Sequence, residues 1–299
     1  GAGTRAGVAA AYTPGMTFLL GLAMAADPLP LPNTCDAYVT DAAKRPLHAI
    51  DELLRSGLEL DIEAERALGD QLHQEIVNQE YPGMVDTDRR SLRYVRKVAK
   101  RVLKGVDDPR FDYKVHFIDE GTVNAFAIPG GHVYIHRGLM EQWVQNEAQL
   151  AVVLGHEIGH IELRHPSALV EYLNGFPLLA GDVGFIVLAM SRSLFSSAQE
   201  LDADDFGMRA AHLGGYDVAE GVTLWESQID KPGRSDGRQN RLLDLLGELG
   251  NIVSSHPDAR ARACYNTEHH NALNEEFPQR DGYVGERKFR KRRVLGPRW

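Results

Sequence analysis

The sequence is most informative at residues 149–165, which read QLAVVLGHEIGHIELRH. The eight residues before His156 are almost all apolar, so we expect a helix that is buried around most of its circumference. His156 and His160 are four residues apart, which places their imidazoles on one face of that helix, one turn above the other. Glu157 is displaced by one residue, about 100° around the helix axis.

This H-E-x-x-H spacing favours a metal site. Two imidazoles one turn apart can bind one zinc ion, and an acid at the position of Glu157 can face a metal-bound water without ligating the metal. The alternative is a pair of structural histidines in the core, which would need separate hydrogen-bond partners on an otherwise apolar helix. A chance match is rare in a chain of this length, so the metal site is the stronger prediction.

A catalytic zinc ion normally takes three protein ligands and keeps one position for water. We predict the third ligand about 40 residues downstream, where residues 196–205 read SSAQELDADD. Glu200 and Asp204 share a face of the predicted helix, so Glu200 can ligate while Asp204 accepts the other ring N–H of a ligand histidine. Alone, such an acidic pair is typical of a solvated helix face, but its place after the H-E-x-x-H helix favours the ligand role.

The composition is that of an ordinary globular protein. With 299 residues, of which 43% are hydrophobic and 25% charged, the chain is not largely disordered, fibrous or a multi-span membrane protein. The net charge of −9 argues against nucleic acid as the main partner. Residues 286–299 nevertheless carry seven bases and one acid. We expect a solvated or disordered basic tail there, or a patch for anionic lipid or another polyanion.

The first residues indicate export. No charged residue occurs between Ala6 and Ala26, Arg5 precedes this stretch, and its apolar centre covers residues 16–24. This pattern predicts a secretory signal peptide over residues 1–26, with an uncleaved membrane anchor or an added segment as alternatives. Cys35 and Cys264 are the only cysteines, and one long-range disulfide is possible in a secreted protein.

Hydrophobic spacing predicts an α+β domain that is mostly helical. Apolar residues three and four apart indicate helices over residues 36–54, 62–79 and 88–104. Alternation then indicates strands at 113–119, 122–127 and 132–136, with residues 129–131 as a turn between the last two. Helices return from about residue 145. The apolar stretch 176–190 predicts a buried helix or one lying on a membrane surface.

Four stretches together resemble the HtpX-like and CAAX prenyl protease family of gluzincin zinc metallopeptidases, in its soluble, exported bacterial type. They are NAFAIPGGHVY at 124–134, HEIGH at 156–160, ELDAD at 200–204, and SHP at 255–257 with Arg262 following. The similarity runs roughly from Glu63 to Ala263. It implies a zincin-like metallopeptidase domain over residues 36–280, with a small β-sheet and the H-E-x-x-H active-site helix.

The resemblance implies a metal-site role for five of the matched residues. His156, His160 and Glu200 would ligate one zinc ion per chain. Glu157 would be the general base that takes a proton from the attacking water. Asp204 would orient His156.

Further roles are implied for the substrate strand and for a loop near the zinc. Backbone hydrogen bonds to an extended substrate would come from the strand with Asn124, Ala125, Phe126 and Ala127. His256 and Arg262 would lie on the loop, where His256 either stabilises the oxyanion or acts as a removable fourth ligand. Without the resemblance, His256-Pro257 reads as an ordinary helix-start turn and Asn124 as a turn-facing residue.

The predicted function is therefore that of a zinc-dependent endopeptidase in the periplasm. Its substrates would be extended or misfolded polypeptides of the cell envelope, in protein quality control, and association with a membrane surface is possible through the tail or the N-terminal segment. The alternative is a latent, chaperone-like protein that holds client polypeptides while His256 blocks the zinc site.

Overall fold

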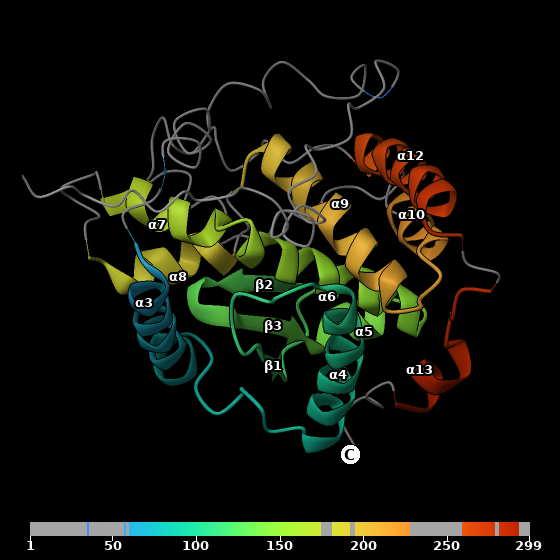
Figure 1. Ribbon diagram of the computed structural model, residues 1–299. Helices are drawn as coiled ribbons and strands as arrows, with labels where there is room; N and C mark the ends of the chain where they lie inside the picture. Colours follow the sequence, from blue (N-terminus) through green and yellow to red (C-terminus); the bar gives the residue numbers. More distant parts are fainter. Residues whose placement is uncertain are drawn as a thin grey trace, which may run out of the picture. The chain divides into compact units, whose positions relative to one another are not determined.

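The computed structural model of the chain describes residues 35, 57, 60–174, 181–191, 195–227, 259–278 and 281–292 (Figure 1). All of them belong to one compact unit, Leu31–Trp299. The predicted signal peptide or anchor, the predicted helix at 36–54 and His256 lie outside the described residues.

In the described part of the chain, two α-helices precede the sheet, and each begins at an aspartate. Helix α3 (Ile62–Glu75) starts at Asp61, whose carboxylate accepts a hydrogen bond from the amide of Ala64, and it continues as a π-helical turn over Ile76–Glu80. Helix α4 (Arg89–Val102) starts at Asp88, which caps two amides of its first turn, and ends in a 3-10 turn at Leu103–Gly105. The helices predicted at 62–79 and 88–104 are thus confirmed.

The sheet has three short strands: β1 (Lys114–Ile118), β2 (Ala125–Ile128) and β3 (His132–His136). Their order is β1-β3-β2, with β3 parallel to β1 and antiparallel to β2. The predicted turn is a 3-10 segment, Pro129–Gly131, in which Gly130 has a φ of 77°, a value that favours glycine. All three predicted strands are confirmed, although β2 starts at Ala125 rather than at Thr122.

Helices cover the sheet and build the core around it. Phe126 and Ile128 of β2 and Tyr134 of β3 belong to one buried apolar cluster with residues of α3, α7 (His165–Asn174) and α8 (Val183–Ser191). Helix α4 packs against β1, and α6 (Glu147–Glu162) packs against β2 and β3. The described part of the predicted apolar stretch 176–190 is therefore a buried helix.

Helix α6 is anchored at its first turn by a buried carboxylate. Asn146 caps the helix by accepting a hydrogen bond from the amide of Gln149. Glu147 accepts hydrogen bonds from the hydroxyl groups of Tyr94 at 2.9 Å and Tyr216 at 3.0 Å. A negative charge there also suits the positive end of the helix dipole.

Helix α9 (Ser197–Leu213) crosses α6 at close range (Figure 1). It begins with a capping box formed by Ser196 and Gln199. Glycines occupy the crossing on both sides: a Cβ at Gly155 of α6 would lie 2.5 Å from the carbonyl oxygen of Gly207 of α9. Only glycine allows this approach, which brings the predicted metal ligands of the two helices together.

The remaining described helices are α5 (Arg137–Gln142), α10 (Ala219–Glu226), α12 (Ala259–Glu276) and α13 (Glu286–Arg292). Helix α12 packs against α9 and α10. Within the predicted basic tail, α13 buries Phe289, while the side chains of Arg287, Lys288, Arg290 and Lys291 are exposed. Among the described residues, no helix combines the length and apolar character needed to cross a membrane. The mostly helical α+β fold with a small sheet is as predicted.

Candidate metal centre

His156 and His160 lie one turn apart on α6, as their spacing predicts. Their rings meet edge to face with centroids 4.6 Å apart, and their Nε2 atoms are 3.0 Å from each other. Both are buried. The helix therefore presents two imidazole nitrogens to one point.

Glu200 of α9 brings a carboxylate to the same point. Its Oε2 lies 3.6 Å from Nε2 of His156, and its Oε1 lies 3.6 Å from Nε2 of His160. Neighbouring ligand atoms of a tetrahedral zinc ion, with bonds of 2.0–2.2 Å, are separated by roughly 3.3–3.5 Å. Two imidazoles and one carboxylate at these separations fit the donor set of a catalytic zinc ion.

Asp204 lies against the outer ring nitrogen of His156. Its Oδ1 lies 2.8 Å from Nδ1 of His156. A proton on that nitrogen, donated to the carboxylate, would leave the lone pair of Nε2 for a metal ion. Burial opposes the charge on Asp204, but Arg262 and His156 outweigh it and hold the pKa of that carboxyl well below its usual range. Asp204 therefore remains a hydrogen-bond acceptor.

His165 contacts the ring of His160, and the sequence does not predict this contact. Its position just after the H-E-x-x-H helix suggests a helix-end residue near the negative end of the dipole, without a role at the site. It instead begins α7, is buried, and places Nδ1 2.9 Å from Nδ1 of His160. Burial lowers the pKa of His165 to about 3, so the neutral ring can accept the Nδ1 proton of His160.

Arg262 lies on helix α12 and not on a loop, which corrects the expectation from the resemblance. Its guanidinium donates from Nε to Asp204 at 2.8 Å and from Nη1 to Glu200 at 2.9 Å. It also stacks 3.7 Å above the ring of Trp225. With both carboxylates bound, Arg262 has the contacts of a residue that positions Glu200 and Asp204.

Glu157 is buried beside the two histidines. Burial raises its pKa to about 7. A carboxyl group with a pKa near 7 exchanges protons readily at neutral pH, which suits general base and acid catalysis.

The predicted substrate strand occupies one edge of the described sheet. Ala125, Phe126 and Ala127 are buried residues of β2. Asn124 donates a hydrogen bond from its amide to the carbonyl oxygen of Ser191, at the end of α8, at 2.8 Å. His256 lies outside the described residues.

A second group of histidines consists of His73 of α3, His116 of β1 and His132 of β3. Known metal motifs do not predict it, because its members come from three separate elements. The sequence offers only a weak indication of this group, namely that His116 and His132 each lie in a strand predicted from alternating residues.

Comparison with known proteins agrees with this arrangement. The profile of Peptidase family M48 matches residues 89–265, which include α6, α9 and Arg262. The chain is 24% identical over 217 residues to the mitochondrial metalloendopeptidase OMA1 of Schizosaccharomyces pombe, covering 68% of this chain and 60% of that protein.

Two bacterial relatives, both from Escherichia coli K12, show comparable similarity. The beta-barrel assembly-enhancing protease is 27% identical over 160 residues, covering 46% of this chain and 33% of that protein. The metalloprotease LoiP is 28% identical over 162 residues, covering 49% of this chain and 62% of that protein. The chain thus spans less than two thirds of the length of each of these relatives. The family match covers more than half of the chain, and the chain belongs to Peptidase family M48.

Proposed function

We propose that this protein is a zinc-dependent endopeptidase with His156, His160 and Glu200 as metal ligands and Glu157 as the general base. The observation that carries the proposal is the convergence of two imidazoles and one carboxylate from α6 and α9, with ligand atoms all within 4.8 Å of one another. Membership of a peptidase family gives the reaction class.

In this mechanism a zinc ion, when bound, supplies a water activated for attack on a peptide carbonyl. Glu157 takes the proton of that water and passes it to the leaving amine nitrogen. Asp204 and His165 hold the rings of His156 and His160 in the tautomers that leave Nε2 free for the metal. Arg262 holds the two carboxylates in place.

The proposed substrates are extended or misfolded polypeptides. Strand β2 lies at an edge of the sheet and α6 packs against it, which supports substrate pairing along this strand through backbone hydrogen bonds. Such pairing reads little side-chain sequence, so it suits an endopeptidase that clears unfolded chains. The name of the beta-barrel assembly-enhancing protease supports a substrate in the bacterial envelope.

The proposed location is the periplasm, as in the exported type of the HtpX-like group. The charge-free stretch at residues 6–26 supports export. A disulfide between Cys35 and Cys264 gives independent support, because such bonds persist in oxidising compartments. Membrane-surface association through the exposed basic side chains of α13 is a further part of the proposal.

Hydrolysis of unfolded casein by the full chain tests the proposal. The rate is expected to fall to background after treatment with a zinc chelator and to return when zinc is restored. A tightly folded substrate of similar size should resist cleavage. Hydrolysis that survives chelation, or no hydrolysis by the zinc-loaded protein, would contradict the proposal.

A further inference from the structure

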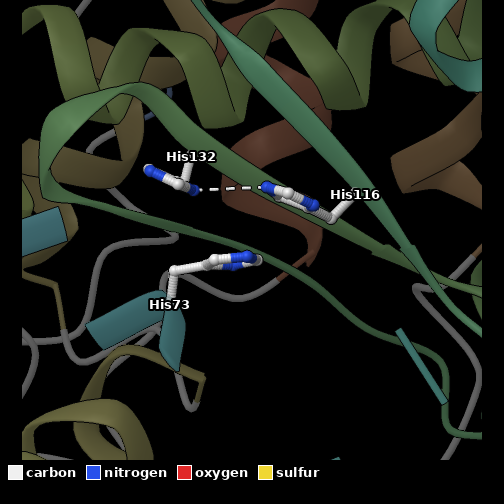
Figure 2. A group of neighbouring side chains, drawn as sticks. All are labelled: His73, His116 and His132. Atoms are coloured by element: carbon white, nitrogen blue, oxygen red, sulfur yellow. Dashed lines mark hydrogen bonds between the residues drawn. The ribbon is translucent and has the colours of Figure 1, made fainter. Parts of the chain in front are cut away.

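Three histidines gather between the sheet and helix α3. His116 comes from β1, His132 from β3 and His73 from α3 (Figure 2). In the parallel pairing, His132 lies beside Lys114 and His116 beside Tyr134, so their side chains share one face of the sheet. His73 stacks on His116 with ring centroids 4.5 Å apart. One imidazole nitrogen from each residue lies within 4.8 Å of the other two.

The closest pair of nitrogens has the separation of two ligands on one metal ion. Nε2 of His116 lies 3.2 Å from Nδ1 of His132, and the dashed line in Figure 2 marks this contact. Neighbouring ligands of a tetrahedral zinc ion are separated by roughly 3.3–3.5 Å. His116 and His132 could therefore bind the same metal ion without a large movement of either ring.

Each of the three rings has a polar partner for its other nitrogen. Nδ1 of His116 lies 3.0 Å from Asp86, and Nε2 of His132 lies 3.2 Å from Asp70. Nδ1 of His73 lies 2.8 Å from the hydroxyl group of Tyr134. Metal-binding histidines almost always donate their second N–H to a carboxylate or another oxygen, and all three rings have such an oxygen here.

These contacts have a consequence for the protons. If His116 and His132 both donate to their carboxylates, two lone pairs face each other across 3.2 Å, and a cation bound between them would relieve their repulsion. We propose that His73, His116 and His132 form a second metal site, which binds a divalent ion of the zinc type. The proposal does not rest on the proposed peptidase function.

The composition of the cluster indicates which metals it would take. Three imidazoles without a thiolate suit zinc, nickel or copper(II) rather than magnesium or calcium, which prefer oxygen ligands. The carboxylates of Asp70 and Asp86 balance the charge of a divalent ion. His116 and His132 are buried, whereas His73 is half-buried and gives the ion a route from solvent. Because it stacks on His116, the His73 ring must swing towards the edge of that ring to ligate.

Lys114 provides the competing arrangement. Its Nζ lies 2.8 Å from Asp70 and 3.3 Å from Nε2 of His132. If Lys114 donates to that nitrogen, His132 can donate from Nδ1 to His116, and the pair is satisfied without a metal ion.

Zinc stoichiometry separates the two arrangements. The full chain, free of any histidine tag, is stripped with chelator, dialysed against low-micromolar free zinc, and its bound zinc is measured by mass spectrometry. We expect two equivalents in the wild type. The double variant His156→Ala/His160→Ala should keep one equivalent, and His73→Gln should also keep one. Combining all three changes should leave none.

Matched variants make the result specific. His270→Gln changes another half-buried histidine, on α12, and should keep two equivalents. Asp86→Asn should weaken binding at the cluster by roughly 10- to 100-fold, because it removes the carboxylate that orients His116. In the His156→Ala/His160→Ala background, Co²⁺ should give the intense visible absorption of a tetrahedral ion, and His73→Gln should abolish it.

A single equivalent in the wild type that disappears with His156→Ala/His160→Ala would overturn the second site while leaving the proposed peptidase site intact. Zinc binding by that double variant that is unchanged by His73→Gln and by Asp86→Asn would also overturn it. Far-ultraviolet circular dichroism of each variant checks that the fold is retained. A failure of casein hydrolysis alone bears only on the peptidase proposal.

Discussion

Gly207 of α9 lies directly against the backbone of His156: a Cβ at Gly207 would stand 2.4 Å from the amide nitrogen of His156. Real Cβ atoms do not approach a backbone atom this closely. Glu200 can lie next to the two histidines only because Gly207, two turns further along the same helix, has no side chain to hold α9 away from α6.

Gly207→Val should therefore separate α6 from α9. Overpacking of this kind costs about 1–3 kcal/mol of stability, and the wider crossing should also weaken zinc binding. Thermal unfolding and a zinc titration measure the two effects. Gly184→Ala on α8 is the matched control, because a Cβ there meets only ordinary contacts at 3.6 Å. Equal zinc affinity of Gly207→Val and the wild type would contradict the role assigned to the crossing.

Asp204→Asn should weaken zinc binding by roughly 10- to 100-fold. The amide can offer its NH₂ group to Nδ1 of His156, which favours the tautomer whose Nε2 carries the proton and cannot ligate. Competition with a chelator of known affinity measures the change. Asp202→Asn, on the same helix and half-buried, should leave the zinc affinity unchanged. If Asp204→Asn and Asp202→Asn bound zinc with similar affinity, the role assigned to Asp204 would be contradicted.

The disulfide between Cys35 and Cys264 should stabilise the domain. It joins residues 229 positions apart, and Cys264 follows Arg262 by two residues on α12. Loss of a native disulfide typically costs about 2–5 kcal/mol. Urea unfolding with and without reductant should show this difference in the wild type. The variant Cys35→Ser/Cys264→Ser should unfold at the lower urea concentration in both conditions, and a wild type insensitive to reductant would contradict the prediction.

Local patterns predicted the elements that carry the site. The apolar residues before His156 and the four-residue spacings of His156/His160 and Glu200/Asp204 depend only on helix periodicity, and the structure places these residues together on α6 and α9. Alternation likewise located all three strands. The grouping of the two helices was predicted from the place of the acidic pair after the H-E-x-x-H helix and from the resemblance, and the glycine crossing explains it physically.

Contacts between distant segments could not be predicted in the same way. His165 faces His160 because the chain turns between α6 and α7, and no periodicity reports such a turn. Arg262 reaches Glu200 and Asp204 from a helix about 60 residues further along the chain. The grouping of His73 with His116 and His132 needs the β1-β3 register and the placement of α3, and neither follows from sequence spacing.

The variant Glu157→Gln tests the central claim most directly. Glutamine keeps the shape of the side chain but cannot take a proton, and Glu157 is not a proposed metal ligand. Casein hydrolysis and zinc content are measured on the same preparations of variant and wild type. We predict unchanged zinc content and a rate lower by roughly 100- to 10,000-fold. Hydrolysis at the wild-type rate by the zinc-loaded variant would contradict the account.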